Sequence, residues 1–330
     1  MDLSTSYLGL KLNTPLVVGA SPFGDDTHLA RQVEDAGAGA IVMRSLFEEQ
    51  IYLDGLARAP GAAESLRPPD RKRSFFPALP EYQLNPDQYL RQIADLKAAL
   101  AIPVIASLNG CRPGGWISFG QRFEAAGADA IELNLYHFSD DPERSALAVE
   151  AELLETVRLL KASVRIPVAV KLQPYFTSLA HFARELERVG ADGIVLFNRM
   201  YQSDFDVDDQ ETVTELRLSQ PEEAVLRMRW LESLAARTQC SLAITGGVHS
   251  GKDAIKAILA GAHAVQLVSV LLQNGPRFLT TVADGLRQWM QQHGYRSIAD
   301  FRGKMRLHTA ADESAAARGD YQRLLQTWRI

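Results

Sequence analysis

The sequence has little cysteine, no long apolar run and no N-terminal leader pattern, and each absence excludes a class of protein. Its two cysteines, Cys111 and Cys240, are too few for an iron–sulfur cluster or a cysteine-built zinc site. No stretch approaches the roughly 20 apolar residues needed to cross a bilayer. The first residues lack the basic start and apolar segment of a signal peptide. We therefore expect a cytoplasmic protein that needs neither disulfides nor a membrane.

Basic patches are also missing, which argues against nucleic acid as a partner. The net charge is −5 over 330 residues, and the sequence has no dense run of lysine or arginine. The composition is 46% hydrophobic and 23% charged, which is ordinary for a globular protein with a large core. The length would allow two domains, but barrel enzymes often exceed about 250 residues as one unit.

A short glycine motif recurs four times and predicts the fold. In each copy the glycine stands among small residues, after a helical pattern and before an apolar run. The four glycines are Gly37, Gly127, Gly190 and Gly261. A glycine in this place is typical of a helix end that adopts a left-handed conformation. The intervals are 90, 63 and 71 residues, each about twice the length of one strand–helix unit.

Four further apolar runs lie between these motifs, starting at Pro15, Pro103, Pro167 and Ser241. Runs that are apolar on both faces are typical of parallel strands covered by helices. Eight strands alternating with helices predict a closed (β/α)₈ TIM barrel, as a single domain over residues 1–330. The alternative is an open doubly wound sheet, but this sequence has no Gly-x-Gly-x-x-Gly turn after its first predicted strand. Two insertions, at about 49–86 and 201–218, interrupt the period, and the second is acidic and predicted to be an exposed flap.

Polar residues stand where the predicted strands end, and barrel enzymes keep their chemistry there. These ends are Gly19-Ala20-Ser21, Arg44-Ser45, Ser107-Leu108-Asn109, Asn134, Lys171, Asn198, Thr245-Gly246-Gly247 and Val268-Ser269. Packing alone does not explain polar residues at so many strand ends. The sequence therefore predicts an active site at this end of the barrel.

The last two strand ends predict a phosphate-bearing cofactor. Gly246 and Gly247 follow strand seven and Ser269 follows strand eight, the usual phosphate position of barrels, although a plain tight turn is the alternative. Lys171 should point into the pocket mouth and meet an anion or a carbonyl there, unless it extends outward along the rim. Asn134 is able both to donate and to accept, which suits the edge of a heterocycle.

Four segments together resemble the dihydroorotate dehydrogenases, most closely the soluble class 1 enzymes. They are Glu132-Leu133-Asn134-Leu135, Val170-Lys171-Leu172-Gln173-Pro174-Tyr175-Phe176, Thr245-Gly246-Gly247-Val248 and Ser297-Ile298-Ala299-Asp300-Phe301. The resemblance implies an FMN-dependent enzyme of pyrimidine biosynthesis that passes a hydride from dihydroorotate to flavin N5. We also expect a homodimer, and any iron–sulfur path must lie on a separate electron-transfer partner.

The resemblance also assigns cofactor contacts. Lys171 matches a catalytic lysine that contacts the flavin ring, where a cation stabilises the anionic reduced form. Other positions match flavin contacts or their neighbours: Ala20, Ser21, Arg44, Ser45, Asn109, Asn134, Asn198, Gly246, Gly247, Val268 and Ser269. Arg44 stands where the family usually has lysine, which keeps the charge and changes its shape.

The loop after Asn134 departs from the family. Soluble members carry a catalytic cysteine, and membrane-bound members a serine, where this chain has His137. Imidazole, with a pKa near about 6.5, is able to accept a carbon-bound proton, but a rim residue without a chemical role is the alternative.

The expected substrate contacts are also altered, although Asn134 and Asn198 remain. Ser139 and Glu81 replace asparagines, and Arg199 replaces a serine. Three functions therefore stay open: a dihydroorotate dehydrogenase, an FMN enzyme for a related ring, and a flavin-binding electron-transfer subunit or pseudoenzyme that does not use dihydroorotate.

Overall fold

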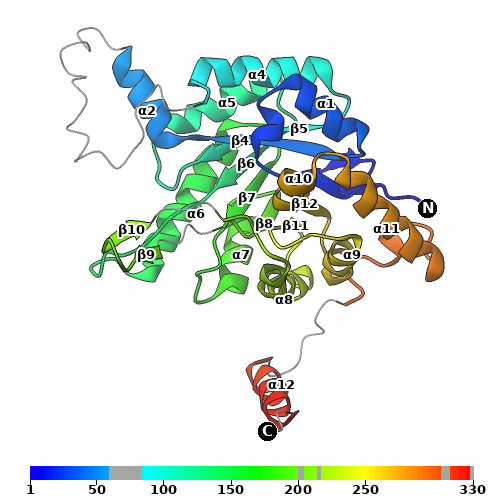
Figure 1. Cartoon of the computed structure of the whole chain (residues 1–330). Helices are drawn as coiled ribbons and strands as arrows, with labels where there is room; N and C mark the ends of the chain where they lie inside the picture. Colours follow the sequence, from blue (N-terminus) through cyan, green and yellow to red (C-terminus); the bar gives the residue numbers. More distant parts are fainter. Residues whose placement is uncertain (59–82, 200–203, 214–216, 306–312, 328–330) are drawn as a thin grey trace.

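Eight parallel strands form a closed barrel in the computed structural model, which describes residues 1–58, 83–199, 204–213, 217–305 and 313–327 (Figure 1). Around the barrel the strands run β3 (Leu16–Val18), β4 (Ala40–Phe47), β5 (Val104–Asn109), β6 (Ala130–Asn134), β7 (Val168–Leu172), β8 (Gly193–Leu196), β11 (Ser241–Thr245) and β12 (Ala264–Leu267). Pairing of β12 with β3 closes the ring. The predicted (β/α)₈ fold is confirmed.

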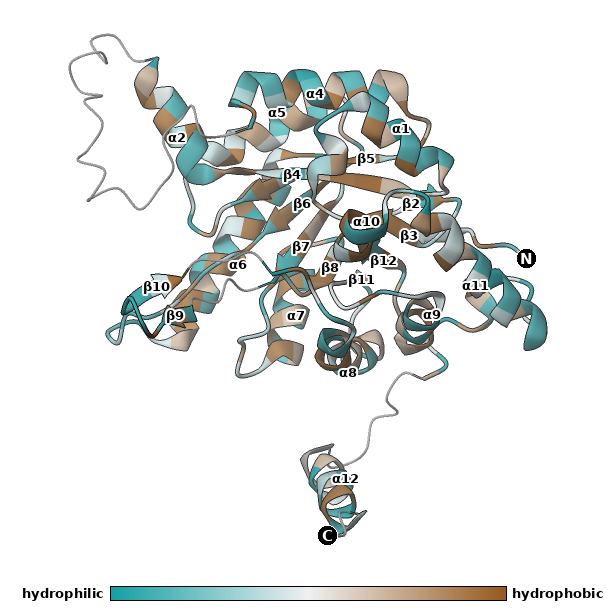
Figure 2. Ribbon diagram, viewed as in Figure 1, coloured by the Kyte–Doolittle hydropathy of each residue, from teal (hydrophilic) through white to brown (hydrophobic). Residues whose placement is uncertain are grey.

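Helices cover the outside of the barrel. They are α1 (Thr27–Asp35), α4 (Pro86–Ala99), α5 (Phe119–Ala125), α6 (Ala146–Ser163), α7 (Leu179–Arg188), α8 (Ala224–Ala235), α9 (Gly251–Ala260) and α11 (Phe278–Gln292). Apolar residues at helical spacing face the sheet, as with Leu179, Phe182 and Leu186 of α7, all of which are buried. The barrel strands are mostly apolar and the outer helix faces mostly hydrophilic in Figure 2.

The four repeated glycines end helices, as predicted. Gly37, Gly127, Gly190 and Gly261 have φ of +98°, +99°, +99° and +122°. A side chain at such angles is strained, so the motif reports a backbone requirement that glycine meets at low cost. Each turn leads within a few residues into a buried strand.

The amino end of the barrel is closed by an N-terminal hairpin that the sequence did not predict. It consists of β1 (Thr5–Tyr7) and β2 (Leu10–Leu12). Tyr7 and Leu8 are buried within the barrel, and the Leu8 N–H donates to Ser241 Oγ at 3.0 Å. A Cβ on Gly193 would collide with the Leu8 side chain, so glycine at this position leaves the space that Leu8 occupies. The amino end of the barrel is therefore filled by side chains of this hairpin.

The two insertions are partly described. The first begins as α2 (Glu48–Ala57), and the rest of it up to residue 82 lies outside the described residues. The second contains a hairpin, β9 (Asp204–Asp206) and β10 (Glu211–Val213), with Phe205 and Val207 exposed. The described part of the predicted flap is therefore exposed, as expected.

Two features near the C-terminus do not belong to the strand ends. The Ser297–Phe301 segment bridges to Asp2, and Phe301 packs edge-on against Trp289. The Ser297–Phe301 segment, one of the four that resemble the family, therefore stabilises the fold and does not lie at the strand ends. The helix α12 (Glu313–Thr327) lies apart from the barrel (Figure 1). Among the described residues, no helix combines the length and apolar character needed to span a membrane.

Candidate active site

The predicted site residues gather at the carboxyl ends of the barrel strands. Asn134 of β6 lies in register with Asn109 of β5 and with Lys171 of β7. Between β4 and β5, Ser45 Oγ and Ser107 Oγ lie 2.7 Å apart. The remaining predicted positions follow directly from the ends of β3, β8, β11 and β12: Ala20, Ser21, Asn198, Gly246, Gly247, Val268 and Ser269.

A buried ion pair forms the floor of this site. Lys171 Nζ donates to Glu132 Oε1 at 2.9 Å, and the Glu132 residue is only 1% exposed. The other carboxylate oxygen, Oε2, accepts from Gln266 Nε2 at 2.5 Å. Burying two charges is costly unless each is paired and hydrogen-bonded, as here. Glu132 and Gln266 were not predicted as site residues, although a glutamate and a glutamine inside apolar strands are a usable signal.

Several buried acceptors beside this floor have no partner. Asn134 Oδ1, Gln173 Oε1 and Gln266 Oε1 are buried and lack a hydrogen-bond partner in the part of the chain that the structure describes. Such atoms cost free energy unless something donates to them. A planar heterocycle with N–H and carbonyl groups fits acceptors grouped around a lysine. The residues present therefore fit a flavin ring.

The predicted phosphate end contains a further residue, Ser219, that the sequence did not identify. The Gly247 N–H donates to Ser219 Oγ at 3.1 Å, and the Ser219 N–H donates to Ser269 Oγ at 2.9 Å. Ser269 begins α10 (Ser269–Asn274), and the first N–H groups of a helix have no acceptor within it. Backbone donors and hydroxyls therefore converge here and are hydrogen-bonded to one another, so a phosphate at this place would replace some of these bonds.

The two glycines of this turn are also needed for packing. Gly246 and Gly247 have φ of +84° and +77°. A Cβ on Gly247 would collide with the backbone N of Ala224 at the start of α8, and one on Gly246 would lie 3.0 Å from the guanidinium of Arg227. Arg227 is buried and donates through Nε to Thr245 O at 2.6 Å. A side chain introduced at Gly247 would therefore disturb packing against α8 whether or not a phosphate binds here.

The rim residue Arg44 is already paired. Its Nε donates to Asp25 Oδ2 at 2.6 Å, and the Arg44 side chain is about half exposed. Burial raises the pKa of Asp25, while Arg44 opposes that shift. The backbone of β4 is irregular between Val42 and Ser45, which gives Arg44 its place at the rim. A ligand that uses Arg44 must compete with Asp25.

His137 lies in the loop after β6, among charged residues of neighbouring loops. Burial lowers its pKa below the usual value of 6.5, and the nearby Arg144 and Arg112 add to the effect. Its Nε2 is buried without a hydrogen-bond partner among the described residues. Arg144 itself pairs with Glu152 of α6 at 2.5 Å. The imidazole is therefore neutral at pH 7 and has a free ring nitrogen, as a proton acceptor needs.

Cys111, in the loop after β5, does not replace the cysteine that the family carries in the next loop. Burial, followed by the charge of Glu48, raises the pKa of its thiol to about 12. The thiolate, which is the reactive form, is therefore scarce at neutral pH. His137 remains the candidate base.

The predicted substrate positions are more exposed than the floor. Ser139 is exposed, while Asn198 and Arg199 are partly exposed. The Asn198 N–H donates to Leu172 O at 2.6 Å, and Arg199 lies 3.6 Å from Glu223. Glu81 lies outside the described residues.

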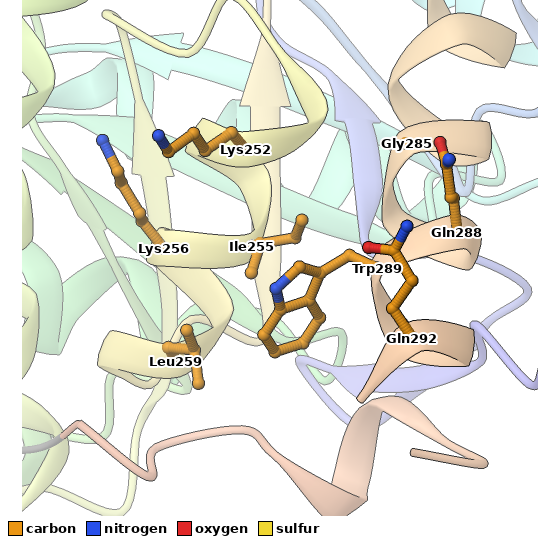
Figure 3. Close-up of a pocket in the computed structure, with 8 residues that line it drawn as sticks. All are labelled: Lys252, Ile255, Lys256, Leu259, Gly285, Gln288, Trp289 and Gln292. Atoms are coloured by element: carbon orange, nitrogen blue, oxygen red, sulfur yellow. The ribbon is translucent and has the colours of Figure 1, made fainter. Parts of the chain in front are cut away.

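A groove of about 460 Å³ lies elsewhere, between α9 and α11 on the outer face of the barrel (Figure 3). Ile255, Leu259 and Trp289 line it, with Lys252 and Lys256 at its edge. It contains none of the strand-end residues described above. Within the described ranges, no group of three or more histidine, cysteine or acidic side chains is placed to hold a metal.

Comparison with known proteins decides the family. The family described as dihydroorotate dehydrogenase matches residues 83–290. A protein of Aeropyrum pernix with the provisional name dihydroorotate dehydrogenase A (fumarate) is 30% identical, over 92% of this chain and 97% of its own length. The chain belongs to the dihydroorotate dehydrogenase family. It is thus a member of a family of oxidoreductases, in agreement with the resemblance seen in the sequence.

More distant members of the dihydroorotate dehydrogenase family carry a different name. Proteins of Thermoplasma acidophilum and Methanosarcina acetivorans, 25% and 27% identical, are each named dihydroorotate dehydrogenase B (NAD(+)), catalytic subunit. They match 92% and 88% of this chain, and 98% and 92% of their own lengths. The similarity to the dihydroorotate dehydrogenases therefore extends along almost the whole barrel.

Proposed function

We propose that this protein is an FMN-dependent oxidoreductase that transfers a hydride between a dihydropyrimidine-like ring and flavin N5. The observation that carries the proposal is the grouping of Lys171 with three unpartnered buried acceptors, from Asn134, Gln173 and Gln266, at the carboxyl end of the barrel. Without a ligand at this place, these groups would stay unsatisfied among the described residues at considerable cost.

The ring and the phosphate would be held by different parts of the rim. Lys171 and Asn134 would contact the ring, while Gly247, Ser219 and Ser269 would supply donors to the phosphate. FMN, when bound, supplies the hydride acceptor. The protein contributes a fixed cation and fixed acceptors on strands, so little reorganisation is needed when charge develops.

His137 would take the proton that leaves the substrate carbon next to the hydride donor. Its Nε2 has no partner among the described residues, and its lowered pKa keeps it unprotonated at neutral pH. Ser139 and Arg199, in place of asparagine and serine, would give the substrate pocket a different set of donors. Dihydroorotate is therefore the first substrate to test, and a related ring with other substituents would undergo the same chemistry.

Electrons would leave through a separate partner chain. Cys240 is buried, and burial raises the pKa of both thiols in the protein. Two such cysteines cannot bind a cluster. The relatives named as catalytic subunits support a partner, and we further propose that the barrel forms a homodimer.

Anaerobic mixing of the purified protein with dihydroorotate tests the function. We expect FMN in the purified protein and rapid, saturable loss of its visible absorbance. Chemical reduction with dithionite is the control that the bound flavin is able to accept electrons. Protein without flavin would overturn the cofactor, whereas flavin reduced by dithionite but not by dihydroorotate would overturn this substrate.

A further inference from the structure

The ion pair in the barrel floor is unusual because its acidic member is more deeply buried than its basic one. Glu132 is 1% exposed, and Lys171 is 7% exposed. The Glu132 carboxylate is held from two sides, by Lys171 Nζ at 2.9 Å and by Gln266 Nε2 at 2.5 Å. All three side chains come from barrel strands, so their positions are fixed by strand register. The ammonium group of Lys171 is therefore hydrogen-bonded to the buried Glu132 carboxylate in the floor of the site.

We infer that Glu132 is a positioning residue that fixes Lys171 Nζ and partly neutralises it, and thereby holds down the reduction potential of bound FMN. This inference rests on the proposed function. A lone cation beside the flavin would strongly favour the reduced, negatively charged ring. With Glu132 behind it, Lys171 presents a weaker field, because the opposite charge lies within hydrogen-bond distance.

The second oxygen of Glu132 explains why the pair can be altered without disrupting its surroundings. In Glu132→Gln, the new amide oxygen still accepts from Lys171. The new amide NH₂ would face the NH₂ group of Gln266, but the Gln266 amide is able to rotate. Its Oε1, which has no partner among the described residues, then accepts from the amide introduced at position 132. The substitution therefore removes one charge and keeps the hydrogen bonds.

The decisive measurement is the midpoint potential of FMN bound to Glu132→Gln, compared with the unaltered protein at pH 7. We expect binding of reduced over oxidised flavin to improve at least tenfold, which equals about +30 mV for a two-electron couple. A merely structural role would not move this potential. An unchanged or lower potential in flavin-loaded Glu132→Gln overturns the inference.

Asp192→Asn serves as the matched control. Asp192 accepts from Lys161 at 2.6 Å outside the barrel, so this variant also removes the acidic member of a partly buried ion pair. Its FMN potential should equal that of the unaltered protein. An equal rise in both variants would mean that loss of an ion pair, and not the place of Glu132, sets the potential, and would overturn the inference.

A second measurement needs no flavin. Glu132→Gln and Lys171→Met should each lower the melting temperature, and the double variant should melt above both, since neither charge is then left alone. If Glu132→Gln does not fold, rescue by added Lys171→Met supports the coupling, whereas losses that simply add, or no rescue, overturn it. Protein that binds no FMN would overturn the proposed function. The melting temperatures of the two single variants and the double variant would still measure the coupling between Glu132 and Lys171.

Discussion

The two ends of the barrel differ in the kind of side chain that fills them. At the amino end, the hairpin residues Tyr7 and Leu8 fill the interior against small side chains of the strands. At the carboxyl end, polar side chains enter the interior, and acceptors of Asn134 and Gln266 have no partner among the described residues. The hydroxyl of Tyr7 also lacks a partner among the described residues, but the amino end is otherwise a packed apolar core, whereas the unpartnered acceptors of the carboxyl end accompany a buried ion pair.

This difference predicts how the two ends respond to substitution. Changes at the carboxyl end should alter flavin chemistry at little cost in stability, unless they leave a charge unpaired. Changes at the amino end should alter stability and leave the chemistry intact. Barrel enzymes in general divide function and stability in this way.

The largest expected effect is the loss of the proton acceptor. His137→Ala should slow flavin reduction by substrate about 100-fold or more, as expected for a general base. In the unaltered protein the rate should rise as pH increases through the lowered pKa of His137 and become flat by about pH 7. His137→Cys should move that rise upward, towards the thiol value of about 8.5. Rapid-mixing kinetics across pH measure both, and an unaffected rate in His137→Ala would place this residue on the rim without a role.

Removal of the floor cation should come next. Lys171→Ala should slow flavin reduction about 100-fold, because a fixed charge is lost where negative charge develops. Binding of FMN should weaken much less. Since Glu132 is left buried and unpaired, the variant should also lose about 3 kcal/mol or more of stability. Reduction kinetics and denaturant titration separate the two effects, and normal kinetics in flavin-loaded protein would remove Lys171 from the site.

Low pH should lower the stability of the protein through a buried histidine at the amino end of the barrel. His263 accepts the Leu242 N–H through Nδ1 at 3.1 Å, and burial, followed by Arg302, lowers its pKa to about 4. The unfolded chain takes up this proton near pH 6.5, so stability is lost as pH falls from about 6.5 to 4, by on the order of 2 kcal/mol. His263→Gln should flatten the dependence of the unfolding free energy over this range. If the slope is the same in both proteins, His263 is not its source.

The smallest expected effect lies at the phosphate end. Ser219→Ala removes the hydroxyl that joins Gly247 and Ser269, so FMN should bind about threefold to tenfold more weakly. Fluorescence titration of apoprotein with FMN measures this. Ser163→Ala, which removes a hydroxyl at the far end of α6, is the matched control. Equal affinities in all three proteins would show that Ser219 takes no part in binding.

Sequence periodicity was enough to predict the barrel and which residues follow each strand. Asn134 and Lys171 could be placed at one rim because parallel strands share a carboxyl end. Which interior side chains meet was not predictable in the same way. Glu132 and Gln266 are 134 residues apart, and only the register of the closed barrel brings them together.

Short elements also escaped prediction. The strands of the N-terminal hairpin have three residues each, too few for an alternating pattern to stand out. Its turn uses Leu8 and Gly9 with positive φ, and leucine gives no sign of that conformation in a sequence. Ser219 was similarly missed, because it follows the acidic insertion and not a strand end.

The hairpin has a consequence for how the protein is made. Synthesis reaches it before any barrel strand, but the Leu8 N–H needs Ser241, 233 residues later, and the Thr5 hydroxyl donates to the carbonyl of His263, 258 residues later. Until β11 and β12 have left the ribosome, Tyr7 and Leu8 have no barrel to fill. The hairpin therefore emerges ahead of the barrel and is among the last segments to reach its final place, and a nascent chain that stops before residue 241 carries it as an exposed apolar segment.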